Sequence, residues 1–435
     1  MANIAFLGAG SLGFGRRLVS DILSFPELAD GTIHLMDPSA ERLGFIHNLS
    51  ERMVEAAGLP TSIESSTERE AALDGADYVI ASVRVGEGMA PEALDVRIPY
   101  EVGGLRQTVS DTIGVGGIMK GLRTIPAMLD IAYDMERLCP TAVLLNYTNP
   151  MSMIMWAISE ATSITSIGLC HSVQNTARQL AGYMDVDLDT LTYHVAGINH
   201  MAWFLKLERE GEDLYPTLRA CLDNDEIVAR DPVRFDIYRH LGMFVTESSR
   251  HMAEYVPYYM KDEAEMARVD VTHRTGEQMA GQNETRTKQR AEAQEKMLQE
   301  APEIVRSNEY GAQIIHAMET DSSLTVYGNV PNTGLITNLP DGCSAEVPCL
   351  VNRSGLHPCY VGALPPQLAA LCRTNVNMQE LVVRAVLDGD RESAYHAAML
   401  DPNTASQLSL PKIRECMDLL LTAQNDLLPE ALRST

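Results

Sequence analysis

The sequence predicts an α/β protein in which an N-terminal doubly wound parallel sheet is followed by a C-terminal α+β domain. Two observations predict this fold. Short apolar runs alternate with helical patterns through the first third of the chain, and a glycine-rich loop directly follows the first of these runs. Strands and helices in alternation are typical of a parallel sheet covered by helices. At 435 residues, the chain is long enough for more than one domain.

The predicted strands are short and apolar throughout, as is typical of strands that are buried on both faces. We expect them at residues 3–7, 32–36, 78–83, 142–145 and 164–169. Apolar residues at helical spacing predict helices between these strands. These helices are expected at residues 16–23, 40–57 and 121–138.

Beyond about residue 190 the alternation ends. Residues 263–318 are rich in Glu, Gln, Ala and Arg, which predicts helices with solvated faces. Three β-like segments then precede a helical tail. We expect strands at 323–330, 345–351 and 358–363, and helices at 379–387 and 412–424. The change of pattern predicts one domain over residues 1–190 and a second over residues 191–435.

The overall composition excludes several classes of protein. The net charge of −25 argues against a broad nucleic-acid interface, which needs clustered Lys and Arg. The most apolar stretch, around residues 151–158, is far shorter than the ~20 residues of a membrane span. No basic segment precedes the first strand, and the eight cysteines show no Cys-x-x-Cys spacing. We therefore expect a cytoplasmic protein with free thiols and no nucleic-acid or membrane partner.

The glycine-rich loop is the clearest functional motif. Its sequence is Gly8-Ala9-Gly10-Ser11-Leu12-Gly13, between the first strand and the first helix. In a Rossmann-type fold, the first glycine allows the turn, the second lets a pyrophosphate approach the backbone, and the third allows close helix packing. Asp37 closes the second strand, where it would bind the adenosine ribose hydroxyls and repel a 2′-phosphate. The pattern predicts an NAD-binding site formed by Gly8, Gly10, Ser11, Gly13 and Asp37.

Two residues of metal-ligand type follow strand-like runs. Cys170 ends one run and His200 ends another. Ligands bind beyond the carboxyl ends of the strands in such sheets, so these side chains could share a divalent metal. Each alone has an ordinary alternative, since buried cysteines are often inert and single histidines are often structural. With two protein ligands, the metal site would be open and catalytic.

Two further polar strings lie at predicted strand or loop ends. Asn149 precedes a proline in Asn-Tyr-Thr-Asn-Pro, which leaves its amide available for ligand hydroxyls, or the string simply forms a turn. Asp111 lies in a second glycine-rich loop, Ser-Asp-Thr-Ile-Gly-Val-Gly-Gly, where it would either cap a helix or point into the cleft.

Taken together, the ordered strings resemble glycoside hydrolase family 4, the NAD- and metal-dependent glycosidases, over nearly the whole chain. Besides those above, the matching strings are Gly-Leu-Cys-His-Ser-Val-Gln, Ala-Gly-Ile-Asn-His-Met-Ala, Phe-Val-Thr-Glu-Ser-Ser-Arg-His-Met-Ala-Glu-Tyr, Val-Tyr-Gly-Asn-Val and Tyr-His-Ala-Ala-Met-Leu-Asp-Pro. Cys170-His171-Ser172 is similar to the melibiase, or α-galactosidase, branch. The pattern that marks 6-phosphoglycosidases is absent from the sequence.

The resemblance implies a mechanism unlike two-carboxylate glycoside hydrolysis. NAD takes a hydride from C3 of the sugar, a base removes the C2 proton, and the metal acts as a Lewis acid. The leaving group departs from C1 by elimination. Water then adds to the unsaturated ketone, and the hydride returns to C3. The family metal is usually manganese.

The resemblance also implies roles for particular residues. Cys170 and His200 would be the metal ligands, and Asn149 would bind sugar hydroxyls. Tyr255 is the expected base, with Tyr258 or Asp111 as alternatives. His171 would contact the leaving-group oxygen, or else position the substrate.

Three substrate or reaction classes stay open. The expected substrate is a terminal α-galactoside of the melibiose or raffinose type. An α-hexuronide or α-glucoside is the alternative within the family. A uronate would need an arginine against its carboxylate. Arg84 is our expected substrate contact, and Arg97 and Arg106 are further candidates. A simple NAD-linked sugar or hydroxy-acid dehydrogenase is the alternative outside the family. We expect residues 1–190 to bind NAD and residues 191–435 to bind substrate and metal and to form a homodimer or homotetramer.

Overall fold

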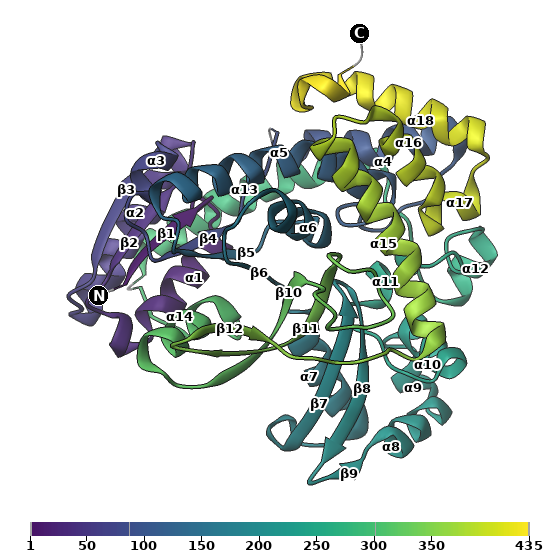
Figure 1. Ribbon diagram of the computed structural model, residues 1–435, viewed down its shortest axis with the longest axis horizontal. Helices are drawn as coiled ribbons and strands as arrows, with labels where there is room; N and C mark the ends of the chain where they lie inside the picture. Colours follow the sequence, from purple (N-terminus) through teal and green to yellow (C-terminus); the bar gives the residue numbers. More distant parts are fainter. Residues whose placement is uncertain (1, 87, 301, 434–435) are drawn as a thin grey trace.

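The computed structural model describes residues 2–86, 88–300 and 302–433 (Figure 1). Its first half contains a six-stranded parallel sheet in the order β3-β2-β1-β4-β5-β6. This is the strand order of the doubly wound dinucleotide-binding fold. The strands are β1 (Asn3–Leu7), β2 (Thr32–Met36), β3 (Ser62–Ser66), β4 (Tyr78–Ala81), β5 (Val143–Asn146) and β6 (Ser166–Leu169). The predicted fold class is confirmed.

Strand β3 is the one parallel strand that the apolar pattern does not predict. It lies at the sheet edge and pairs only with β2 among the described strands. Its side chains are exposed or half-buried, so its sequence Ser-Ile-Glu-Ser-Ser has no apolar run. The strands on either side of β1 agree with the predicted runs to within two residues. Strand β4 is buried throughout, and β2 alternates buried and half-buried residues.

The helices of the first half connect these strands. They are α1 (Phe14–Leu23), α2 (Ala40–Ala57), α3 (Arg69–Leu73), α4 (Ala90–Gly103), α5 (Gly114–Leu138), α6 (Met151–Ala161) and α7 (Ser172–Met184). Helix α2 begins where the Ser39 hydroxyl accepts a hydrogen bond from the backbone N–H of Arg42. It ends at Gly58, whose φ of 63° is the left-handed conformation that glycine adopts readily. These signals explain why the predicted bounds of α2 are confirmed.

The strands of the second half continue the same sheet. Strand β10 pairs antiparallel with β6, and the order continues β10-β11-β7-β8-β9, with β12 beside β11. These strands are β7 (Leu191–Ile198), β8 (Met201–Arg209), β9 (Glu212–Asp213), β10 (Leu324–Pro331), β11 (Ser344–Asn352) and β12 (Gly355–Pro358). The two halves are therefore joined through backbone hydrogen bonds. The strand predicted at 358–363 is wrong except at Pro358, because β12 folds back onto β11 through a tight turn.

The helices of the second half surround these strands, and α15 runs along the right of Figure 1 from the C-terminal helices toward β8. The helices are α8 (Tyr215–Ala220), α9 (Asp225–Val228), α10 (Pro232–Leu241), α11 (Ser249–Tyr255), α12 (Glu263–Arg268), α13 (Gly276–Gln299), α14 (Tyr310–Thr320), α15 (Pro366–Leu387), α16 (Arg391–Leu400), α17 (Pro402–Gln407) and α18 (Leu410–Ala423). Helix α15 packs against α5 and α6 as well as α16, so it links the two halves.

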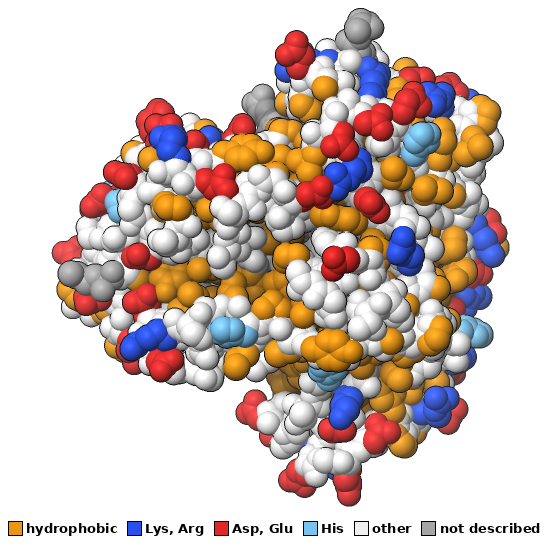
Figure 2. Space-filling model, viewed as in Figure 1, with side chains coloured by type: hydrophobic (Ala, Val, Ile, Leu, Met, Phe, Trp, Pro, Cys, Tyr) orange, Lys and Arg blue, Asp and Glu red, His pale blue; other side chains and the backbone are white. Residues whose placement is uncertain are grey.

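The distribution of charged and apolar side chains is that of a globular protein with a buried core. On the face shown in Figure 2, charged side chains of both signs lie mainly toward the periphery, and the middle of the face is mostly apolar or uncharged. One contiguous apolar core extends through both halves. All eight cysteines are free thiols, as predicted. Among the described residues, no helix is both long and apolar enough to span a membrane.

Candidate active site

The glycine-rich loop lies between β1 and α1 and packs against Asp37. A side chain at Gly8 would place its Cβ 2.1 Å from the carbonyl oxygen of Ser82, and φ at Gly8 is 81°. The backbone N–H of Gly10 donates to Oδ2 of Asp37 at 3.1 Å, and a Cβ at Gly10 would lie 2.4 Å from the same oxygen. Gly8 and Gly10 are therefore the positions where the turn and the close approach require glycine.

The third glycine of the motif does not have the packing role predicted for it. Nothing lies within 4 Å of a Cβ built on Gly13, so the prediction that this residue permits close helix packing is wrong. That role belongs to Gly15, where a Cβ would lie 2.1 Å from the carbonyl oxygen of Ala9. The spacing of the motif alone does not reveal this shift, because α1 begins only at Phe14. Ser11 lies in the loop, and its carbonyl oxygen accepts from the N–H of Gly15 at 2.7 Å.

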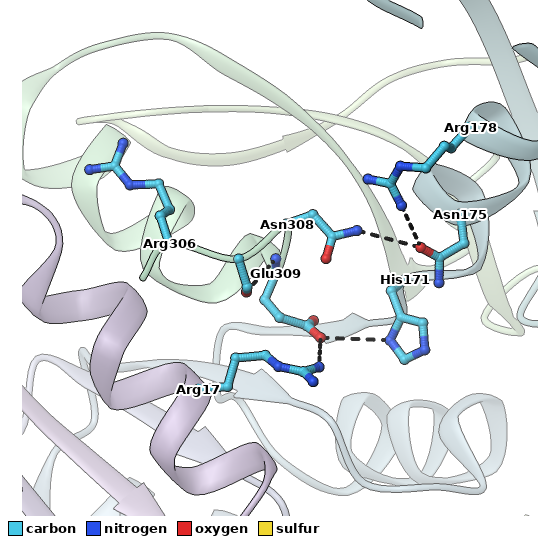
Figure 3. A pocket seen from close by; sticks show the side chains of 8 residues that line it. Arg17, His171, Asn175, Arg178, Arg306, Asn308 and Glu309 are labelled. Carbon is cyan, nitrogen blue, oxygen red and sulfur yellow. Dashed lines mark hydrogen bonds and ion pairs between the residues drawn. The ribbon is translucent and has the colours of Figure 1, made fainter. Parts of the chain in front are cut away.

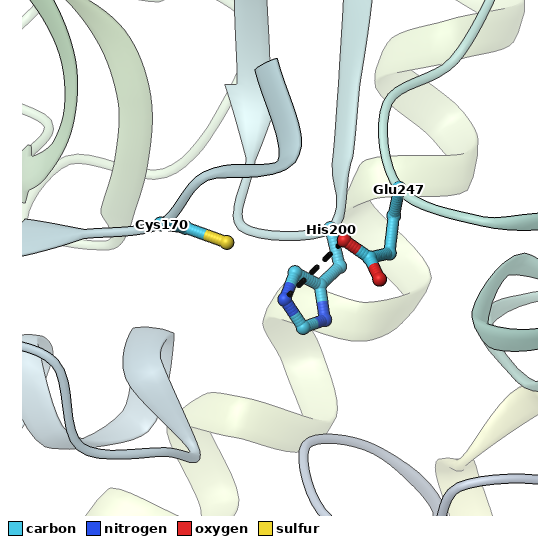
Figure 4. Close-up of side chains that lie close together, drawn as sticks. All are labelled: Cys170, His200 and Glu247. Carbon is cyan, nitrogen blue, oxygen red and sulfur yellow. Dashed lines mark ion pairs between the residues drawn. The ribbon is translucent and has the colours of Figure 1, made fainter. Parts of the chain in front are cut away.

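Cys170, His200 and Glu247 form a cluster of metal-ligand type at the carboxyl edge of β6 (Figure 4). One ligand atom from each residue lies within 4.8 Å of the other two. Cys170 follows β6, His200 lies in the turn between β7 and β8, and Glu247 lies in the loop before α11. Nε2 of His200 is 3.9 Å from Oε2 of Glu247. The structure thus brings together the two predicted ligands and adds a carboxylate that the strand-end argument does not find.

The donors of this cluster suit a divalent cation. Thiolate, imidazole and carboxylate are the side-chain ligands of transition metals. Burial raises the pKa of the Cys170 thiol to about 11, so a bound cation would be needed to hold it as the thiolate. Glu346 of β11 is also fully buried, and neither of its oxygens has a hydrogen-bond partner among the described residues. Its pKa is raised well above the usual value, first by burial and then by the nearby Cys170. A bound cation would supply positive charge beside both buried acidic groups, Cys170 and Glu346.

Tyr255 lies against His200. Its side chain is 1% exposed, and its hydroxyl donates to Oγ1 of Thr112 at 2.9 Å. The same hydroxyl is 3.3 Å from Nδ1 of His200, the ring nitrogen on the side away from Glu247. Burial raises the pKa of Tyr255 well above its ordinary value. Tyr258, the alternative base, is 46% exposed and its ring packs on Tyr259. Of these two tyrosines, the structure places Tyr255 at the cluster.

Helix α11 brings the second glycine-rich loop to the same place. Glu254, which is fully buried beside Tyr255, accepts hydrogen bonds from the backbone N–H groups of Thr108, Val109 and Ser110. These bonds hold the loop that leads into Thr112. The sequence gives Glu254 only as one letter of a matching string, because its function depends on a contact more than 140 residues away.

Asp111 is the first member of a chain of charges that reaches the cluster. Its carboxylate is 3.8 Å from Nζ of Lys120 and 3.9 Å from Nε2 of His251. Nδ1 of His251 lies 2.6 Å from Oε1 of Glu247. Burial opposes ionisation, but Lys120 and His251 hold the pKa of Asp111 well below its usual range. Burial opposes the charged form of His251, but Asp111 and Glu247 raise its pKa to about 10. A carboxylate with such a low pKa is a weak base. The ionised Asp111 can instead orient its positively charged neighbours Lys120 and His251.

Asn149 and Arg84 also lie beyond the carboxyl ends of parallel strands. Asn149 follows β5, and its Oδ1 accepts from the N–H of Met151 at 3.3 Å, at the start of α6. Arg84 follows β4 and donates to the carbonyl oxygen of Gly88 at 2.9 Å, while its Nε lies 3.7 Å from Glu92. The other candidate arginines are paired as well, Arg97 with Glu101 at 3.9 Å and Arg106 with Glu263 at 2.8 Å.

His171 lies at the start of α7, directly after Cys170. Its side chain is 53% exposed, and its Nδ1 is 3.8 Å from Oε1 of Glu309. It is close enough to the cluster for its charge to help lower the pKa of Glu247. Burial by itself would raise the pKa of Glu247. The charges of His200, His251 and His171 outweigh burial, and the pKa of Glu247 falls to about 2. His171 therefore lies at the edge of the cluster that is open to solvent.

The chain matches known proteins over nearly its full length. The model described as "Family 4 glycosyl hydrolase" matches residues 3–186, and the model of that family's C-terminal domain matches residues 195–404. An α-galactosidase of Bacillus subtilis is 40% identical over 99% of this chain and 100% of its own length. An α-galactosidase of Rhizobium meliloti is 37% identical over 98% of this chain and 89% of its own length. A solved 6-phospho-α-glucosidase from gut microorganisms, in complex with NAD and Mn²⁺, shares the fold with a TM-score of 0.80 and 19% identity, over 99% of both chains.

Proposed function

The chain belongs to glycoside hydrolase family 4, and on this premise we propose that it is an α-galactosidase that uses NAD and a divalent metal ion to release terminal galactose. The observation that carries the proposal is the cluster of Cys170, His200 and Glu247, with the Tyr255 hydroxyl 3.3 Å from the His200 ring. The two α-galactosidases at 40% and 37% identity support galactose as the sugar.

The two bound groups have distinct places in the protein. Gly8, Gly10 and Asp37 would hold NAD, because the backbone can approach a pyrophosphate there and a carboxylate faces the expected ribose. Cys170, His200 and Glu247 would hold the metal. When bound, NAD accepts and returns a hydride at C3 of the sugar, and the metal draws electron density from the sugar oxygens.

The remaining residues act on the sugar itself. Tyr255 is proposed to remove the proton at C2, since it is the buried tyrosine at the cluster. A buried phenol ionises only with positive charge nearby. The metal ion held by His200 would provide this charge next to Tyr255. Asn149 is proposed to bind sugar hydroxyls, and Arg84 to border the sugar from the loop after β4. His171 is proposed to face the leaving-group oxygen from the open edge of the cluster.

The charged residues around the site argue for a neutral sugar. The guanidinium groups of Arg84, Arg97 and Arg106 each pair with a glutamate of the protein. A uronate would need an arginine fork free to meet its carboxylate. Asp111 is proposed to orient Lys120 and His251 rather than to act as a base, since its pKa is well below the usual range.

A chromogenic α-galactoside tests this proposal directly. Hydrolysis is measured with and without NAD, Mn²⁺ and a thiol reductant, while absorbance is followed at the NADH wavelength. We expect release of the chromophore only with all three present and no net accumulation of NADH. Accumulation of NADH without release of the chromophore would identify a dehydrogenase instead.

A further inference from the structure

A polar cavity of about 640 Å³ opens beside His171 (Figure 3). Its walls come from α1, from the first turns of α7 and from the segment 306–309 before α14. Its volume lies within the range of about 300–1,000 Å³ that is typical of small-molecule sites. None of the residues proposed above for NAD, the metal or the C2 proton lines it. The proposed function uses one lining residue, His171, at the leaving-group oxygen and gives the rest of this cavity no occupant.

The cavity adjoins the cluster of Cys170, His200 and Glu247 through His171. His171, which lines it, is the chain neighbour of Cys170 and contacts Glu309 at 3.8 Å. Glu309 is 3% exposed and also pairs with Arg17 of α1, at 3.6 Å. The Arg17–Glu309–His171 arrangement thus fixes the wall nearest the metal cluster. A molecule bound to the cluster through its sugar would extend past His171 into this space.

The lining offers both donors and acceptors of hydrogen bonds. Oδ1 of Asn175 accepts from Nη1 of Arg178 at 3.2 Å and from Nδ2 of Asn308 at 3.4 Å. Glu309 adds carboxylate oxygens, and His171 adds an exposed imidazole. Among the described residues, no Phe, Tyr or Trp side chain lines the cavity. Sugar hydroxyls donate and accept at once, so this mixture suits a saccharide better than an aryl group.

The three arginines of the cavity do not form an anion site. Arg17 pairs with Glu309, and Arg178 donates to Asn175. Arg306 donates to the hydroxyl and carbonyl oxygens of Ser24 and stacks over the ring of Phe25, with its guanidinium directed away from His171 in Figure 3. A phosphate or carboxylate is recognised where guanidinium forks converge on one point. Here each fork has a protein acceptor of its own.

We propose that this cavity binds the leaving-group saccharide of the substrate, a neutral sugar joined to galactose, through Asn175, Arg178 and Asn308. The inference rests on the proposed function and adds the part of the substrate that the galactose site does not specify. The enzyme accordingly selects galactosyl oligosaccharides over galactosides with an aryl leaving group.

The test compares two substrates in two variants. Arg178→Gln and Asn308→Ala remove one lining group each, and Arg178 is exposed, so its loss should not unfold the protein. We measure kcat/KM for melibiose and for p-nitrophenyl α-galactoside. The melibiose-to-aryl ratio should fall about tenfold in each variant, mainly through KM, as for one lost hydrogen bond to a charged or amide group. Arg414 lies on the distant α18, where it is exposed and pairs with Glu392 of α16, so Arg414→Gln should leave the ratio unchanged.

Binding measurements separate the outcomes. Ligand-detected NMR should show free glucose bound to the wild-type protein and weaker binding to Arg178→Gln. A melibiose-to-aryl ratio within twofold of wild type in both variants would overturn the inference, and so would a strong preference for a phosphorylated leaving group. A rise in the Kd for NAD in either variant would assign the cavity to the cofactor instead. If the wild-type protein cleaves neither galactoside, the proposed function fails first, and the inference fails with it.

Discussion

The hydroxyl of Tyr255 lies 3.3 Å from Nδ1 of His200, while Nε2 of the same ring lies 3.9 Å from Glu247. One imidazole ring therefore connects the proposed base with the proposed metal ligands. Thr112, which accepts from the Tyr255 hydroxyl at 2.9 Å, holds the phenol in this position. The geometry explains how a buried tyrosine, with its pKa raised by burial, could ionise only when the metal is present.

Replacing Tyr255 should remove the base without emptying the site. We expect Tyr255→Phe to lower kcat by about 10²–10⁴-fold, the usual contribution of a positioned base. The Kd values for NAD and Mn²⁺ should stay within a few-fold of wild type. Tyr258→Phe is the matched control, because Tyr258 is 46% exposed and lies outside the cluster. Full activity of Tyr255→Phe would assign the base to another residue.

If Glu247 is a third metal ligand beside Cys170 and His200, the affinity for Mn²⁺ should depend on it. Glu247→Gln keeps the shape of the side chain but removes the charge, so Mn²⁺ affinity should fall by at least about tenfold. Cys170→Ser should have the same effect, whereas Cys359→Ser, a half-exposed cysteine of the same chain, should have none. Titration calorimetry with Mn²⁺ measures all three. Unchanged affinity in Glu247→Gln would limit the protein ligands to Cys170 and His200.

The ion pairs of His251 predict a defined pH dependence of stability in the metal-free protein. The folded-state pKa of His251 is raised from 6.5 to about 10, so its contribution is fully present below about pH 6.5 and disappears as pH rises through 10. Its partners Glu247 and Asp111 have lowered pKa values, so their contributions are present above about pH 4.5 and disappear as pH falls toward 2. The difference in Tm between wild type and His251→Asn should therefore be largest near pH 5–6 and shrink toward pH 10.

Scanning calorimetry across this range measures that difference, which we expect to be on the order of several degrees at its maximum. His240→Asn is the control, since His240 is 71% exposed and its contact with Asp236 is 3.8 Å long. A constant difference between pH 5 and pH 10 would show that the His251 pairs do not stabilise the fold.

The structure predicts different effects for substitutions at Gly13, in the glycine-rich loop, and at Gly15, in the first turn of α1. Gly15→Ala should lower the stability of the protein by about 1–3 kcal/mol, because its Cβ would lie 2.1 Å from the Ala9 carbonyl. Gly13→Ala has space in the protein and should leave Tm nearly unchanged. If NAD lies against the loop at Gly13, Gly13→Ala should raise the Kd for NAD while Tm stays nearly unchanged. Equal losses of Tm in both variants would contradict the assignment of the close contact to Gly15.

Much of the fold could be predicted from local sequence patterns. The apolar runs of β1 and β2 and the capping residues of α2 are confirmed because each element is specified by its own residues. Strand β3 could not be found in this way, since its pairing with β2 depends on tertiary contact rather than on apolar side chains. The pairing of β10 with β6, which joins the two halves, has no local signal either.

The candidate site divides in a similar way. Cys170 and His200 each follow a strand-like run, and the family resemblance assigns both as metal ligands. The two strands run in opposite directions, because β6, β10, β11 and β7 pair antiparallel in turn, so the meeting of these two side chains depends on tertiary pairing. Glu247, His251 and Lys120 are brought to the site by a loop and two helices, and a string of letters does not show which residues face one another. The sequence motif does not reveal the close contact at Gly15, because it gives the spacing of the glycines but not the residue at which α1 begins.

We propose that the enzyme breaks the glycosidic bond only after it removes the C2 proton of the sugar. Hydrolysis of an α-galactoside in D₂O, followed by NMR analysis of the galactose released, measures whether this proton exchanges with solvent. We expect deuterium at C2 of the product, with no net change in NADH. Galactose that carries only protium at C2 would show that no C2 proton is removed.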